Sequence, residues 1–164
     1  MSGSAKRVLI GGVEVGGGSR VKIQSMTTTK TADVEATVRQ IDALEKAGCE
    51  IVRAAVSDEA DAAAVRAVKE RISLPLVADI HFSPSLAVAA IENGADKVRI
   101  NPGNIGGEKE IKYVADCIRA HRIPVRVGSN TGSIEPHFFE KYGRSEHALV
   151  ESALLSLIHI SEPT

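Results

Sequence analysis

A repeated alternation of short apolar segments with helical patterns constrains the fold of this chain more than any other feature. Apolar segments rich in aliphatic residues begin near residues 21, 50, 76, 97 and 124, and a segment with helical spacing of apolar residues separates each from the next. Strands connected in this way lie parallel and are joined by right-handed crossovers. The pattern therefore predicts an α/β protein built on one parallel sheet.

Local signals set the ends of the expected helices. Gly48 and Gly94 stand where C-terminal caps belong, and Ser83 followed by Pro84 is typical of a helix start. The expected helices cover residues 34–44, about 58–72, 84–93, 108–122 and a segment that begins near 145. Before them, the β-type runs 8–10 and 21–24 flank a glycine-rich stretch, which predicts a hairpin turn at 16–18 and then the first strand of the sheet.

The loops after the strands distinguish a barrel from an open, doubly wound sheet. The first strand-to-helix loop, residues 25–33, lacks the glycine fingerprint of dinucleotide-binding folds, and polar residues follow every strand instead of gathering at one crevice. These features favour a (β/α)8 barrel of the TIM type. Since a complete barrel needs about 250 residues, we expect one that is truncated after about five strands.

Composition excludes several classes of partner and site. The 164 residues are 43% hydrophobic and carry a net charge of −1, which is unlike nucleic-acid-binding or membrane-surface proteins. Neither a signal peptide nor a membrane span is expected, so a cytoplasmic location is predicted. Cys49 and Cys117 lie far apart without a Cys-x-x-Cys partner, so we expect no disulfide framework and no metal site in this chain.

Polar residues that follow the strands form the expected site, because barrels place their sites at the C-terminal strand ends. The candidates are Gln24, Arg53, Asp79, His81, Arg99, Asn101, Asn104, Arg126 and Asn130. They include three arginines and one carboxylate. The excess of about two positive charges suits a diphosphate or bisphosphate held by bidentate hydrogen bonds. The asparagines would add neutral donors, and the glycines of the loop 101–107 would free backbone N–H groups for an anion.

Two alternatives remain open for these residues. The arginines at the strand ends can instead pair with acids of the loops, such as Glu35, Asp58 or Glu135. His81 is equally consistent with a general acid and with a structural histidine.

Four segments carry a specific family resemblance. They are 24–27 (Gln-Ser-Met-Thr), 47–53 (Ala-Gly-Cys-Glu-Ile-Val-Arg), 78–82 (Ala-Asp-Ile-His-Phe) and 97–106 (Lys-Val-Arg-Ile-Asn-Pro-Gly-Asn-Ile-Gly). Over residues 7–155 the chain resembles the 4-hydroxy-3-methylbut-2-enyl diphosphate synthases of the non-mevalonate isoprenoid pathway. The resemblance implies an oxidoreductase that reductively opens the ring of 2-C-methyl-D-erythritol 2,4-cyclodiphosphate and removes a hydroxyl group.

The resemblance also implies the roles of particular residues and partners. Residues that match Arg53, Arg99, Asn101, Arg126 and Asn130 hold the cyclodiphosphate, whereas those matching Gln24, Asp79 and His81 lie near it without a separate assigned role in proton transfer. Electrons enter from flavodoxin or ferredoxin through a 4Fe-4S cluster. The cluster belongs to a C-terminal domain, absent here, that closes over the barrel of the partner subunit in a dimer.

The end of the chain departs from the family. Residues 156–164 match nothing expected there, so we expect residues 1–155 to form the barrel part and 156–164 to be a non-native tail. The chain itself is then expected to be inactive. Two further hypotheses remain: a dihydropteroate-synthase-like barrel, which needs no cluster, and a module that binds a diphosphate without turnover.

Overall fold

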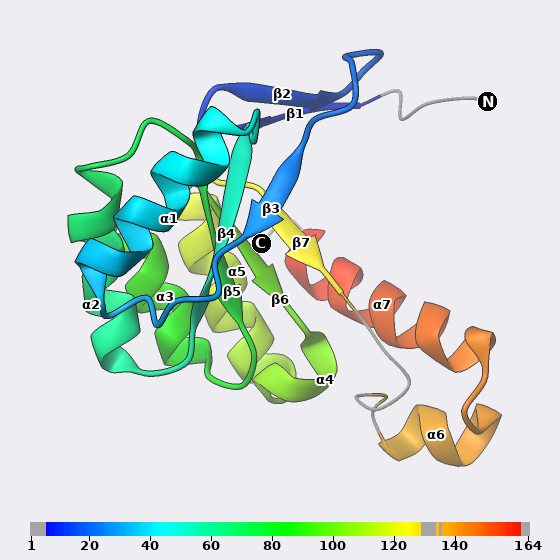
Figure 1. Ribbon diagram of the computed structural model, residues 1–164. Coiled ribbons are helices and arrows are strands. Elements are labelled where there is room, and N and C mark those ends of the chain that lie inside the picture. The colour runs from blue at the N-terminus through cyan, green and yellow to red at the C-terminus, as the bar shows by residue number, and fades with distance from the viewer. Residues whose placement is uncertain (1–5, 129–133, 135, 162–164) are drawn as a thin grey trace.

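The computed structural model describes residues 6–128, 134 and 136–161 and contains two sheets with helices around the larger one (Figure 1). In chain order the elements are β1 (Arg7–Ile10), β2 (Val13–Gly16), β3 (Gln24–Met26), α1 (Val34–Lys46), β4 (Ile51–Val56), α2 (Glu59–Lys69), β5 (Leu76–Ile80), α3 (Pro84–Glu92), β6 (Lys97–Ile100), α4 (Pro102–Ile105), α5 (Glu108–His121), β7 (Val125–Val127), α6 (Pro136–Tyr142) and α7 (Glu146–Ser161).

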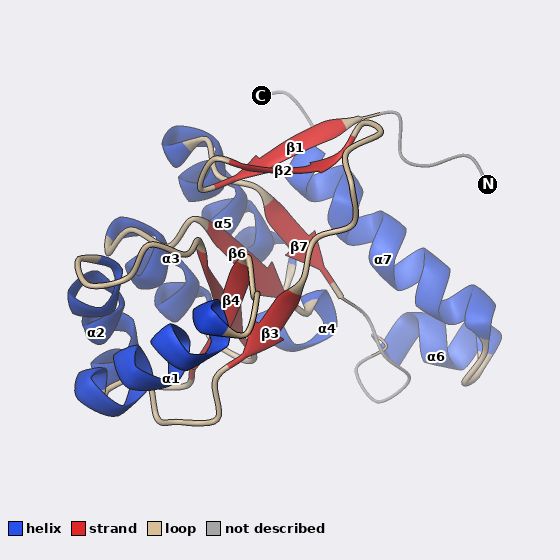
Figure 2. Ribbon diagram, turned by 45° about the horizontal axis from the view of Figure 1, so that its top comes forward, coloured by secondary structure: helices blue, strands red, loops and turns tan. Residues whose placement is uncertain are grey.

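The larger sheet has the strand order β3-β4-β5-β6-β7, and every neighbouring pair is parallel. Strands that are adjacent in the chain are thus adjacent in space, which is the arrangement of a barrel wall and not of a doubly wound sheet. Helices α1, α2, α3 and α5 cover one face of this sheet (Figure 1, Figure 2). The predicted fold class, a barrel of the α/β type with five strands present, is confirmed.

The alternation of side chains along each strand separates an apolar face from a charged one. In β4, Val52, Ala54 and Val56 are buried against the helices, whereas Arg53 points to the opposite face, which we call the inner face. The helix-facing side chains of β5 and β6 join the same apolar cluster as the buried residues of the four helices. The core therefore lies between the sheet and its helices.

The expected helix boundaries agree with the capping groups. The side chain of Ser83 accepts a hydrogen bond from the N–H of Leu86, with Pro84 as the first residue of α3. Gly48 and Gly94 follow α1 and α3 with φ of 93° and 94°, a left-handed conformation that favours glycine at the end of a helix. Helices α4 and α6 are short and were not predicted.

The N-terminal hairpin differs from the prediction. Its second strand is β2, and its turn is at Gly11 and Gly12, whose φ values of 50° and 89° suit the tight turn of a two-residue hairpin. The glycines at 16–18 do form a turn, in which the N–H of Ser19 donates to the carbonyl of Gly16 at 3.0 Å, but it leads out of the hairpin, so the prediction of the hairpin turn there is wrong. Strand β3 begins at Gln24, where the predicted strand ends. Ile10 of the hairpin packs with Ile51 and Val77, so the hairpin covers the inner face at the amino ends of the strands.

None of the helices in the described part of the chain is long and apolar enough to cross a membrane.

Candidate functional site

Asp79 is the centre of a charged cluster on the inner face of the sheet. Its side chain is only 2% exposed, and its Oδ1 accepts a hydrogen bond from Arg99 Nη1 at 3.1 Å. Its Oδ2 lies 3.4 Å from Arg53 Nε and 3.7 Å from His81 Nε2. One buried carboxylate thus faces two guanidinium groups and an imidazole, which leaves the cluster with a net positive charge.

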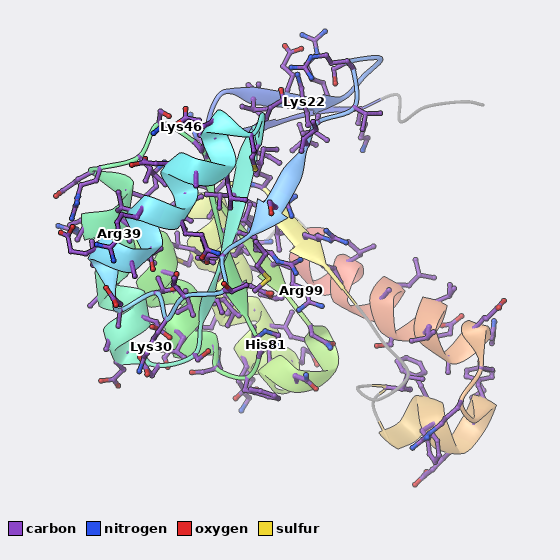
Figure 3. All side chains as sticks on the ribbon, in the orientation of Figure 1. Lys22, Lys30, Arg39, Lys46, His81 and Arg99 are labelled. Carbon is purple, nitrogen blue, oxygen red and sulfur yellow. The ribbon has the colours of Figure 1, made fainter. Side chains whose placement is uncertain are left out.

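The strand register brings these residues together. Asp79 lies on β5, the central strand, and is paired with Arg99 on β6, while Arg53 on β4 is paired with Val77, two residues before Asp79. His81 directly follows β5 and lies toward α4, at the end of the sheet away from the hairpin (Figure 3). The cluster therefore lies toward the carboxyl ends of the strands, where barrels place their sites.

Two residues that sequence reasoning missed support the arginines. Arg53 Nε and Nη2 lie 3.2 and 3.1 Å from the sulfur of Met26, a residue paired with Arg53 across β3 and β4. Gly128 leaves room for the other guanidinium, because a Cβ at this position would lie 3.1 Å from both Nε and Nη2 of Arg99. Because candidates were chosen as polar residues at the carboxyl ends of the strands, neither a methionine nor a glycine was selected.

Among the described residues, no acid of a loop forms an ion pair with these arginines. Glu35 pairs with Arg71, and Asp58 pairs with Lys30. Glu135 lies outside the described residues. Asp79, on the neighbouring strand, is instead the carboxylate that Arg53 and Arg99 share.

Arg126 extends the charged surface beyond Asp79. It is paired with Arg99 in the register of β6 and β7, and its side chain is exposed. Within the described part of the chain, no carboxylate forms an ion pair with it. Lys97, which sequence reasoning did not select, shares a cavity with Arg126. Burial, and secondly the charge of Arg126, lower the pKa of Lys97.

The amide candidates lie at different depths. Asn101 is 2% exposed and precedes α4, and the backbone N–H of Asn104 donates to its carbonyl at 3.0 Å. Gln24 is exposed and opens β3, opposite Ile51 at the start of β4. The prediction that Gln24 lies at the carboxyl end of the first strand of the larger sheet is therefore wrong. Asn130 lies outside the described residues.

The sequence matches a family whose model is described as the GcpE TIM-barrel domain, over residues 5–163. This chain belongs to the GcpE family. Curated relatives of this GcpE chain are named 4-hydroxy-3-methylbut-2-en-1-yl diphosphate synthase (flavodoxin). The protein from Lysinibacillus sphaericus is 54% identical over 92% of this chain and 41% of its own length, and the one from Caldicellulosiruptor saccharolyticus is 51% identical over 91% and 43%.

These relatives confirm the predicted family resemblance and do not favour the dihydropteroate-synthase-like alternative. The GcpE chain spans about two fifths of their length. Among solved structures, the Amycolatopsis orientalis BexX/CysO complex aligns with a TM-score of 0.51 and 18% identity, covering 86% of this chain and 69% of that one. This likeness concerns the fold alone.

The described residues of the GcpE chain do not fit an iron–sulfur cluster. The buried thiol of Cys49 lies 3.0 Å from the carbonyl of Ile51, whereas Cys117 lies on α5, 3.7 Å from His121 Nδ1. No group of three or more His, Cys, Asp and Glu side chains in the described ranges is arranged to hold a metal ion. A cluster with cysteine ligands needs several converging thiolates. We therefore assign no electron-transfer step to the described residues.

Proposed function

We propose that this chain forms the substrate-binding part of a 4-hydroxy-3-methylbut-2-en-1-yl diphosphate synthase, and that the inner face binds the two phosphates of 2-C-methyl-D-erythritol 2,4-cyclodiphosphate. The observation that carries this proposal is the cluster of Arg53 and Arg99 around a single buried carboxylate, with Arg126 beside Arg99 in the strand register. Guanidinium groups bind phosphate oxygens through pairs of parallel N–H donors. An anion at this position would relieve the excess positive charge.

Asp79 has a positioning role in this proposal. Its two oxygens hold Arg99 and Arg53 from opposite sides, so both guanidinium groups are fixed before the ligand arrives. A preorganised site loses less side-chain entropy on binding than one formed from free arginines. Since the carboxylate neutralises only one of the two charges, the arginines retain attraction for a phosphate.

His81 stands at the edge of this site. Its side chain is 42% exposed, and its Nε2 lies within 3.7 Å of Asp79. In this position His81 can donate a hydrogen bond to a phosphate oxygen or hold a proton near the leaving hydroxyl, and we propose it as a contributor without choosing between these roles. Asn101, Asn104 and Asn130 are proposed as neutral donors, and Gln24 as a residue on the amino-terminal side of the ligand.

The reductive half of the reaction belongs to groups beyond the described residues. The relatives' names include flavodoxin, and we propose that flavodoxin or ferredoxin delivers electrons to a 4Fe-4S cluster carried by another domain in a homodimer. The cluster would supply the two electrons that ring opening requires. We also propose a cytoplasmic enzyme in which residues 1–155 form the barrel part and 156–164 a non-native tail.

Isothermal titration of the 164-residue chain with the cyclodiphosphate tests the proposal. Replacing Arg126 with methionine should weaken binding roughly 10- to 100-fold, because one charge-assisted contact contributes about 1.5–3 kcal/mol. The matched control is Arg71→Met, which removes a guanidinium on the helical side of the molecule and should leave affinity unchanged. Equal affinities in both variants would contradict the proposed site.

The hypothesis of a module that binds a diphosphate without turnover makes the same binding prediction. Reduction of the cyclodiphosphate by a full-length relative that carries these residues, with reduced flavodoxin as donor, separates the two. Loss of product formation in its Arg126→Met equivalent would support the enzyme. Unchanged turnover would exclude this site from the reaction.

A further inference from the structure

A second cationic position lies beside the hairpin, on the amino-terminal side of the Asp79 cluster. An open cavity of about 440 Å³ is lined by the hairpin, the segment that follows it and the inner face of the sheet. Its apolar wall includes Ile10, Val15 and Ile51. Lys97 and Arg126 contribute charged side chains to the same cavity.

Side chains alternate between the two faces along β6, so Lys97 lies on the inner face, the same face as Arg99. It is paired with Val77, and Arg99 follows two residues later opposite Asp79. Two residues of a strand span about 6.6 Å, so Lys97 lies about that far from Arg99 toward the amino ends of the strands. We call the level of Lys97 the deeper layer and the level of Arg53, Asp79 and Arg99 the upper layer. Lys97 is half-buried, and in the described ranges no carboxylate forms an ion pair with it.

The neighbouring charges do not neutralise this position. Arg20 and Lys22 also line the cavity, but both pair with Glu50, at 2.5 and 3.7 Å. Asp79 is shared by the two arginines of the upper layer. A buried cation without a partner is costly, so a position of this kind calls for an anion.

Arg126 connects the two layers. It is paired with Arg99 in the strand register, and it lines the cavity together with Lys97. A ligand with two linked phosphates can therefore be contacted in both layers at once, with Arg126 between them. In this arrangement a single phosphate held by Arg53 and Arg99 does not require Lys97.

We propose that Lys97 binds the deeper of two linked phosphates, together with Arg126, while Arg99 and Arg53 bind the upper one. This proposal rests on the proposed function and adds a residue to its site. It makes Lys97 the group that distinguishes a diphosphate from a monophosphate.

Titration of the 164-residue chain with inorganic diphosphate and with orthophosphate tests the assignment. In Lys97→Met we expect diphosphate affinity to fall roughly 10-fold or more, the effect of losing one charge-assisted contact, whereas orthophosphate affinity should change about 3-fold or less. Lys97→Arg keeps the charge and should retain most of the preference for diphosphate. The matched control is Lys22→Met. It removes an ammonium group that lines the same cavity but is already paired with Glu50, so it should change neither affinity by more than about 2-fold.

A measurement on the unaltered chain keeps the test independent of folding of the variants. Acetylation of lysines by acetic anhydride, followed by mass spectrometry, should be slowed at Lys97 by diphosphate and unchanged at Lys22. Circular dichroism of each variant shows whether it is folded.

The outcomes separate this inference from the proposed function. If Lys97→Met binds diphosphate as the unaltered chain does, and Lys97 is not protected, while Arg99→Met loses binding, the inference is overturned and the proposed function stands. If the unaltered chain binds neither diphosphate nor the cyclodiphosphate, the proposed function itself fails.

Discussion

Replacing Asp79 with asparagine removes one negative charge from the centre of the site and keeps the shape of the side chain. The carboxylate is 2% exposed, and the Arg53 and Arg99 side chains retain 26% and 21% exposure. Breaking a fully buried ion pair costs about 3–5 kcal/mol. Because water still reaches part of each guanidinium group, we expect Asp79→Asn to lower the free energy of unfolding by about 2–3 kcal/mol.

Urea unfolding followed by circular dichroism measures this loss. With a slope of about 2 kcal/mol per molar urea, the midpoint should fall by about 1–1.5 M. The matched control is Glu35→Gln, which makes the same change in an exposed pair with Arg71 and should leave the midpoint nearly unchanged. A midpoint for Asp79→Asn that equals that of the control would refute the view that the carboxylate holds two otherwise unpaired arginines.

A ligand experiment separates charge from geometry in the same variant. If Asp79 mainly neutralises the arginines, inorganic diphosphate should raise the urea midpoint of Asp79→Asn more than that of the unaltered chain, because the anion replaces the missing charge. If Asp79 mainly aims the arginines, the variant should gain less than the unaltered chain. The second result would assign Asp79 a positioning role beyond charge.

Three further changes test other parts of the structure. Gly128→Ala places a Cβ 3.1 Å from the Arg99 guanidinium, so diphosphate affinity by titration should fall while the urea midpoint changes little. Ile10→Ala removes a residue that is 2% exposed and should destabilise the chain by about 2–4 kcal/mol in urea unfolding, whereas Leu9→Ala, at a residue 56% exposed, should not. The pKa of Lys97 is lowered in the folded state, so Lys97→Met should stabilise the chain most at neutral pH. That gain should shrink as the pH rises toward the ordinary lysine pKa of about 10.4, where the penalty on the charged form disappears; urea midpoints across this pH range test it, and a constant gain would contradict the assigned cause.

The order of the strands and the faces of the helices could be predicted because apolar spacing has one period in helices and another in strands. Ser83, Pro84 and Gly94 act through local backbone chemistry, so their effects were visible in the sequence. The N-terminal hairpin was predicted with the wrong turn, because Gly11–Gly12 and Gly16–Gly18 are equally able to adopt positive φ. The choice depends on Ile10 packing against Ile51 and Val77, a contact between distant segments.

The candidate site was predicted in composition but not in pairing. The sequence indicated three arginines and one carboxylate, and the structure shows that two of the arginines share that carboxylate through the register of β4, β5 and β6. Lys97 alternates with Arg99 along β6, so the period of a strand alone places it on the inner face. It was missed because only residues at the carboxyl ends of the strands and in the loops after them were considered, and Lys97 opens its strand. No sequence signal pointed to Gly128.

The two faces of the sheet have opposite effects on stability. The helix-facing side chains of β4, β5 and β6 form a continuous apolar cluster with four helices, and burial of this surface favours folding. The inner face instead carries Arg53 and Arg99 around one carboxylate, and Lys97 and Arg126 beside them without an ion pair among the described residues, an excess of positive charge that opposes folding until an anion binds. Substitution of Lys97, the half-buried cation that forms no ion pair among the described residues, should therefore raise stability and lower anion affinity together. Substitution of Arg53 or Arg99 should lower both, because it removes a partner of the buried Asp79. Substitutions in the apolar cluster should lower stability and leave affinity unchanged for as long as the chain remains folded.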